Sequence, residues 1–144
     1  MAPGMNAPLY TTDVLRLAAG LSGPRELLRI DGGAELRSPT CGSRIAISVQ
    51  LDRDRRVEAL SQDVHACAFG QASAALLEAN AIGRCHSELG LALIELSRWL
   101  AQEQDEAGSW PGVAALAPAR TRKGRHGAIL LPLRTLIAAI EAAG

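Results

Sequence analysis

The most regular hydrophobic pattern in the chain is the alternation of apolar and other residues over positions 44–51. One side of this segment carries Ile45, Ile47, Val49 and Leu51. Such alternation is typical of a strand with one buried face. Residues 52–55 are all charged and predict a turn, and residues 56–64 then predict a partner strand. The two strands are expected to pair as a hairpin, with Val57, Ala59 and Leu60 turned inward.

Other segments show helical spacing or strong breakers. A short strand is expected over residues 34–38, because the residue before Pro39 is biased away from helix. Apolar periodicity and capping residues predict helices over 8–20, over 72–81, from Cys85 or Ser87 to 101, and over 128–143. Residues 117–124 are expected to be extended and basic. Strands that precede helices favour an α+β fold, a small three-stranded antiparallel sheet with helices packed on one face.

Composition limits the size and the class of the protein. With 144 residues and 48% hydrophobic content, the chain is predicted to form a single domain over 1–144, with residues 1–7 disordered. Fifteen basic and fifteen acidic residues cancel, and aromatics are only 3%, so neither nucleic acid nor a membrane is an expected partner. The apolar runs are too short to span a membrane and the start does not resemble a signal peptide, so we expect a cytoplasmic protein.

Three cysteines, at positions 41, 67 and 85, form an odd and widely spaced set. This pattern fits reduced thiols or metal ligands better than a disulfide framework. Cys67 lies where a predicted strand turns into an Ala/Leu-rich helix, and a helix start favours the thiolate, the form that binds metals. The alternative is a small buried cysteine that only packs well. Cys85 and His86 are adjacent on a predicted helix and point about 100° apart, which favours structural or surface roles.

The late basic segment offers a partner surface. Arg120, Arg122, Lys123 and Arg125 lie close together without an acidic residue among them. They either dock an acidic partner or pair with the acidic loop at residues 103–109. His126 follows them directly, as a metal ligand or as a helix-start residue bonded to backbone. No nucleophile triad, phosphate-binding glycine loop or carboxylate pair is present, so we do not expect an enzyme.

Several of these features together resemble the iron-sulfur cluster assembly scaffold family, the IscU, SufU and N-terminal NifU group. The residues that carry the resemblance are the turn Thr40-Cys41-Gly42-Ser43, Cys67 before a Ser/Ala-rich helix, and His126 before the closing helix. The resemblance implies that Cys41, Cys67 and His126 hold a transient iron-sulfur cluster or zinc. Ser43 stands where the family has a carboxylate, and Gly127 stands where the IscU branch has its third cysteine. Ser43 and His65 are the candidate fourth ligands.

The resemblance also implies a function and partners. The protein is expected to be a scaffold that accepts sulfur from a cysteine desulfurase, meets a chaperone or apo iron-sulfur acceptor proteins, and can form a homodimer. The stretch around Pro118 resembles the proline-containing segment that the IscU branch offers to its chaperone, which makes Pro118 and the neighbouring basic residues the expected partner-binding surface. Two alternatives remain open at this point. One is a metal-free adaptor or regulator of cluster assembly with a degenerate site, and the other is a persulfide carrier without metal.

Overall fold

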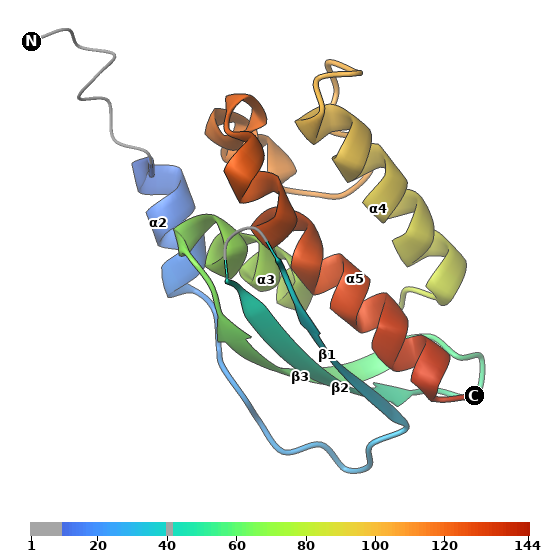
Figure 1. Ribbon diagram of the computed structural model, residues 1–144. Coiled ribbons are helices and arrows are strands. Elements are labelled where there is room, and N and C mark those ends of the chain that lie inside the picture. The colour runs from blue at the N-terminus through green and yellow to red at the C-terminus, as the bar shows by residue number, and fades with distance from the viewer. Residues whose placement is uncertain (1–9, 40–41) are drawn as a thin grey trace, which may run out of the picture.

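An antiparallel sheet forms one layer of the molecule (Figure 1). The computed structural model describes residues 10–39 and 42–144. Within these residues the sheet has three strands, β1 (Gly32–Arg37), β2 (Arg44–Leu51) and β3 (Val57–His65), which pair in sequence order. The predicted hairpin and the α+β class are therefore confirmed. The disorder predicted for residues 1–7 falls outside the described residues.

Helices form the second layer. Their bounds are α2 (Thr12–Ala19), α3 (Ala68–Asn80), α4 (His86–Leu100) and α5 (His126–Ala142), with the 3₁₀ helices η1 (Val113–Thr121) and η2 (Lys123–Arg125) before α5. The closing helix α5 contacts β1 and β2, and α3 packs between α2 and α5 (Figure 1). Helix α4 packs on α5 and η1. In the described part of the chain, no helix is long and apolar enough to cross a membrane.

The core lies between the sheet and the helices. The inward face of β2 supplies the four apolar residues that its alternation predicts, and all four are buried. Phe69 and Leu77 of α3 and Leu136 of α5 meet them, each fully buried. Burial of one such side chain stabilises the fold by about 1.5 to 3 kcal/mol, so this layer contact is the main source of stability.

A β-bulge corrects one prediction about the hairpin. Val57 pairs with Leu51 and Leu60 pairs with Val49, so β3 uses one more residue than β2 over this distance. The extra residue changes the phase of the alternation, and Val57 and Leu60 both face the core. Ala59 pairs with Gln50 on the opposite face, and its predicted inward position is wrong.

The predicted extended segment at 117–124 is also wrong, because η1 and η2 occupy it. Arg120 shows why the local sequence misled the prediction. Its Nε donates to the carbonyl of Trp99 and its Nη2 to that of Gln104, both at 2.8 Å, and its guanidinium lies 5.1 Å from the Trp99 ring centroid. These contacts with the end of α4 hold η1 in place, and they come from residues distant in the sequence.

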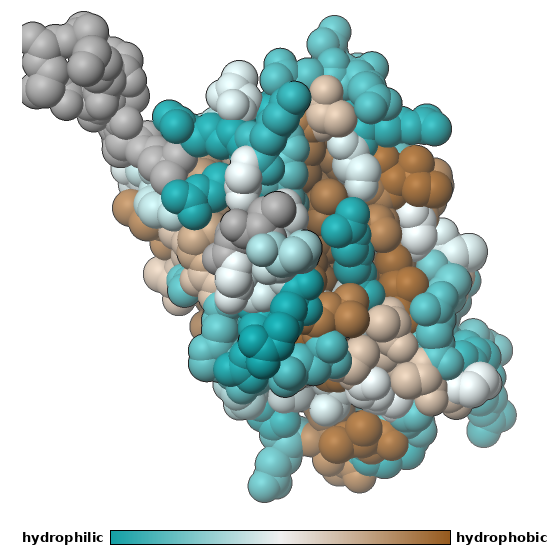
Figure 2. Space-filling view, in the orientation of Figure 1, coloured by the Kyte–Doolittle hydropathy of each residue, from teal (hydrophilic) through white to brown (hydrophobic). Residues whose placement is uncertain are grey.

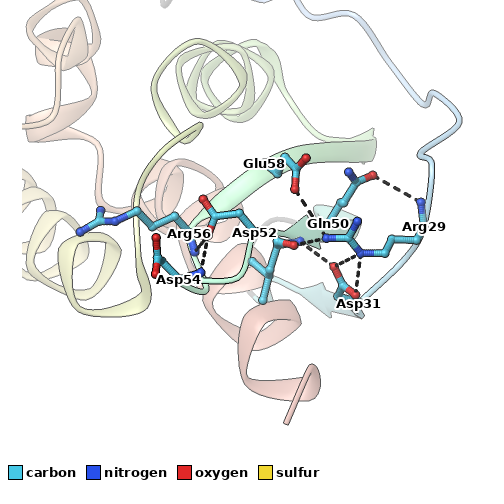
Figure 3. Close-up of polar contacts among 8 residues, drawn as sticks. Arg29, Asp31, Gln50, Asp52, Asp54, Arg56 and Glu58 are labelled. Atoms are coloured by element: carbon cyan, nitrogen blue, oxygen red, sulfur yellow. Dashed lines mark hydrogen bonds and ion pairs between the residues drawn. The ribbon is translucent and has the colours of Figure 1, made fainter.

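The segment before β1 is fastened to the hairpin end of the sheet by a polar cluster (Figure 3). Arg29 donates to the Asp31 carboxylate and to the carbonyl of Leu51, and its Nη2 lies 3.5 Å from Oε2 of Glu58. The Asp31 carboxylate accepts the Leu51 N–H at 2.7 Å, a bond that lowers the pKa of Asp31. Charged groups at this end of the sheet therefore satisfy one another.

Candidate functional site

Cys67 is the N-cap residue of α3, directly before its first helical residue. Strand β3 ends at His65, and Cys67 has the extended conformation of an N-cap residue, one position before the helix rather than within its first turn. Its carbonyl accepts the first helical bond, from the Gln71 N–H at 2.9 Å. Its thiol makes no capping hydrogen bond. The side chain is thus left available for other contacts.

Tyr10 lies near Cys67, a proximity that the sequence did not predict. Its ring meets the Phe69 ring edge-on with 5.1 Å between the centroids, and its hydroxyl is close enough to the Cys67 thiol for that thiol to raise the Tyr10 pKa. Burial raises the pKa of Tyr10, the nearby charge of Cys67 raises it further, and Arg125 opposes both. Tyr10 therefore lies within electrostatic reach of both Cys67 and the residue before His126. Nothing in the local sequence around Tyr10 signals this position.

His126 is the first residue of α5. Its Nε2 lies 2.8 Å from the carbonyl oxygen of Ala119, and a carbonyl can only accept, so Nε2 carries the proton. In the neutral ring, Nδ1 then holds the free lone pair. Metal-binding histidines commonly donate their second ring N–H to a carbonyl in this way. The backbone bond expected of a structural histidine is present, and it also orients His126 as a ligand would be oriented.

Helices α3 and α5 meet near their starts. A Cβ placed on Gly70 would lie 3.3 Å from the Cβ of Ala128, which shows how closely the first turns approach. One helical turn further, the Ser73 hydroxyl donates to the Ile129 carbonyl at 2.6 Å. Cys67 and His126 consequently lie at neighbouring helix starts, at the same end of the molecule.

A hollow of about 500 Å³ adjoins Cys67. It is lined by Gly42, Ser43, Val64, His65, Ala66, Cys67 and Gln71. It forms because Arg44 pairs with His65, so Gly42 and Ser43, just before β2, lie beside the end of β3. Ser43 is buried, whereas His65 is exposed with its Nε2 3.2 Å from Asp63. The hollow brings both candidate fourth ligands next to Cys67, and His126 is not part of its lining.

The described ligands do not complete a metal site by themselves. Among residues 10–39 and 42–144, no three His, Cys, Asp or Glu side chains gather closely enough to hold a metal ion. Cys41, the remaining member of the predicted set, lies outside the described residues. Cys67 and His126 are thus the two predicted ligands that the structure places.

The other candidates have structural partners. The Cys85 sulfur lies 3.2 Å from the Ser87 hydroxyl and caps α4, while His86 Nε2 lies 2.9 Å from Glu141. In the predicted partner surface, Arg120 is engaged with α4 as described above and Pro118 is half-buried in η1. Arg122 and Lys123 are exposed, and Arg125 is half-buried.

Comparison with known proteins gives structural relatives only. No protein-family model matches the sequence, and no curated protein matches it. The N-terminal domain of a nitrogen-fixing NifU-like protein from Brucella abortus aligns with a TM-score of 0.82 and 27% identity over 94% of each chain. The resemblance to the iron-sulfur cluster assembly scaffold family is confirmed.

A second scaffold-like structure has the same fold at lower identity. A putative iron-sulfur cluster assembly scaffold protein for the SUF system from Fervidobacterium islandicum AW-1 aligns with a TM-score of 0.74 and 16% identity, over 92% of this chain and 96% of that one. A hypothetical protein aligns with a TM-score of 0.64 and 23% identity, over 87% and 93%. These two likenesses concern the fold alone.

The departures from the scaffold pattern can now be located. Ser43, in place of the family's carboxylate, is buried in the wall of the hollow beside Cys67. Gly127, in place of the third cysteine of the IscU branch, is the second residue of α5 and directly follows His126. Both departures therefore lie in the same region as the candidate ligands Cys67 and His126.

Proposed function

We propose that this protein is an iron-sulfur cluster assembly scaffold of the NifU and SufU type, which holds a cluster as cargo, or zinc, at Cys41, Cys67 and His126. The observation that supports this most strongly is the state of the two placed ligands. The Cys67 thiol is not used to cap its helix, and His126 is oriented through Nε2 at the neighbouring helix start. In this fold, which resembles that of known scaffold proteins, both residues lie at neighbouring helix starts.

The donor chemistry suits this cargo. Thiolate and imidazole ligands favour zinc and iron-sulfur species over hard cations such as magnesium. Three protein ligands leave a fourth position for Ser43, His65, or a group of the cargo or of a partner. An open position is appropriate for a scaffold, because its cargo has to enter and leave.

The partners follow from the function. We infer that a cysteine desulfurase supplies sulfur, and that a chaperone or apo iron-sulfur acceptor proteins are further partners. The exposed basic residues Arg122 and Lys123 are available for such contacts.

Anaerobic reconstitution with iron and sulfide, followed by metal analysis and visible absorption, tests the proposal. Wild-type protein should bind iron and sulfide, or zinc, and the double variant Cys41→Ser/Cys67→Ser should lose this binding by roughly tenfold or more. His126→Ala should weaken it, while Cys85→Ser is the matched control and should bind like wild type. Equal metal content in wild type and the double variant would refute the site.

A second function is favoured by the incomplete ligand set. Ser43 stands where the family has a carboxylate, and Gly127 stands where the IscU branch has its third cysteine. On these grounds the alternative is a metal-free adaptor or regulator of cluster assembly. It predicts no change in melting temperature when a strong chelator is added, whereas a loaded scaffold should melt at a lower temperature after chelation.

A further inference from the structure

A second hollow, which we call the β1–α5 groove, lies between the end of β1 and the first turns of α5. Its volume is about 380 Å³. Its floor includes Leu36 of β1, which is half-buried, and Leu130 and Leu131 of α5, which are 7% and 3% exposed. Figure 2 shows apolar surface beside α5 with hydrophilic side chains at its margins. The groove thus combines an apolar floor with a polar rim, as peptide-binding grooves do.

The rim is basic. Arg37, Lys123 and Arg134 border the groove, all three are exposed, and no acidic residue lines it. Within the described part of the chain, Lys123 and Arg134 form no ion pair. Arg37 has one exposed partner, Glu35, at 4.0 Å, a geometry that contributes little. Three cations from separate segments therefore surround the floor, and among the described residues two of them, Lys123 and Arg134, have no ion-pair partner.

We propose that the β1–α5 groove docks a short segment of a partner protein that carries acidic residues together with at least one large apolar side chain. The apolar side chain is buried on the leucine floor, and the carboxylates meet the three cations. Complementary charge of this kind selects the partner and speeds its association. The inference goes beyond the proposed function and does not depend on metal binding.

The groove lies next to the candidate site, so a docked partner would be held close to it. Gly127, which also lines the groove, directly follows the candidate ligand His126. A segment held in the groove would bring its protein beside the candidate site. The sequence predicted an acidic partner for the late basic segment, and this proposal keeps that partner. Its contact lies in the groove at Lys123 and not at Arg120, because Arg120 is bonded to the end of α4.

A protein segment explains the groove better than nucleic acid does. Single-stranded nucleic acids need aromatic platforms on which bases stack, and no aromatic residue lines the groove. A leucine floor gives a phosphate backbone nothing to bind. The chain also has no net positive charge to attract nucleic acid over a distance.

The experiment is selection of binders from a displayed library of short random peptides on the metal-free full chain, followed by fluorescence polarisation with the enriched peptides. Enriched peptides should combine Asp or Glu with Leu, Ile or Phe. Their affinity for the Lys123→Glu/Arg134→Glu variant should fall roughly tenfold or more. It should also fall when NaCl is raised from about 0.05 M to about 0.5 M.

The matched control is Arg16→Glu/Arg98→Glu, which changes net charge equally at exposed positions of α2 and α4. It should bind the peptides nearly as wild type does, and circular dichroism should show that both double variants fold. Failure to enrich acidic peptides, equal losses in the two variants, or tighter binding of a single-stranded RNA than of the peptides would each overturn the proposal. A failed reconstitution of the cluster would leave this result unaffected.

Discussion

The starts of α3 and α4 carry the same residue type in the same role, yet their thiols are used differently. Cys67 and Cys85 are both N-caps with extended backbones. The Cys85 sulfur accepts the Glu88 N–H, and the Glu88 carboxylate accepts the Cys85 N–H at 3.1 Å in a reciprocal capping box. The Cys67 sulfur takes no part in capping and lies close enough to Tyr10 to raise the Tyr10 pKa. Sequence position alone does not distinguish a cysteine that stabilises its helix from one available to a ligand.

The hollows at the two ends of the sheet also differ in the chemistry of their linings. The hollow at the hairpin end is about 580 Å³ and the one beside Cys67 is about 500 Å³. At the hairpin end Arg29 pairs with both Asp31 and Glu58, as Figure 3 shows. In the lining of the larger hollow these three charged side chains are thus already paired, whereas the smaller hollow is lined by a thiol that makes no capping bond. The chemistry of the lining, not its size, indicates the site.

The largest expected effect on stability comes from substitution two positions after the N-cap cysteines. Phe69, two residues after Cys67, is fully buried, whereas Ser87, two residues after Cys85, is exposed. Phe69→Ala should lower the free energy of unfolding by about 3 to 5 kcal/mol, since it leaves a cavity under Tyr10. Ser87→Ala should change it by about 0.5 kcal/mol or less. Urea denaturation measures both, and a loss below about 1 kcal/mol for Phe69→Ala would contradict the packing described.

An intermediate effect is expected from removal of the capping thiol. Cys85→Ala should lower the free energy of unfolding by about 1 kcal/mol and speed hydrogen exchange at the Glu88 amide. Cys85→Ser should recover both, because serine is a strong N-cap. Cys67→Ala should not change exchange at Gly70, the matching position of α3. Faster exchange there would show that the two cysteines cap alike.

The smallest effect concerns pH. The Cys85 N–H and then Arg56, 2.6 Å away, lower the pKa of Glu88 from 4.5 to about 2. A depressed carboxyl pKa adds stability above the unfolded-state value, and this contribution is lost as pH falls through the folded-state value. The stability difference between wild type and Glu88→Gln should therefore be constant above about pH 5 and shrink toward pH 2. Thermal melts across this range measure it, and a difference that grows toward pH 2 would reverse the assignment. The first turn of α3 contains no acidic residue and should show no such dependence.

The sequence by itself determined the elements whose pattern is local. Alternation in 44–51, the charged turn at 52–55 and the junction at Cys67 need only nearby residues, because strand period and helix capping act over a few positions. Together with the predicted helices they gave the α+β class, and the junction at Cys67, with the turn at 40–43 and His126, carried the scaffold resemblance. The predicted start of the closing helix, residue 128, lies two residues after the observed start of α5 at His126.

Only the tertiary structure decided what depends on distant residues. The bulge that turns Ala59 outward reflects pairing with β2, and η1 depends on Arg120 reaching α4. The proximity of Tyr10 to Cys67 brings together segments far apart in the chain, and the β1–α5 groove joins two elements of different layers. Such contacts leave no periodic signal in the sequence, because they are set by how the layers pack and not by the conformation of any one segment.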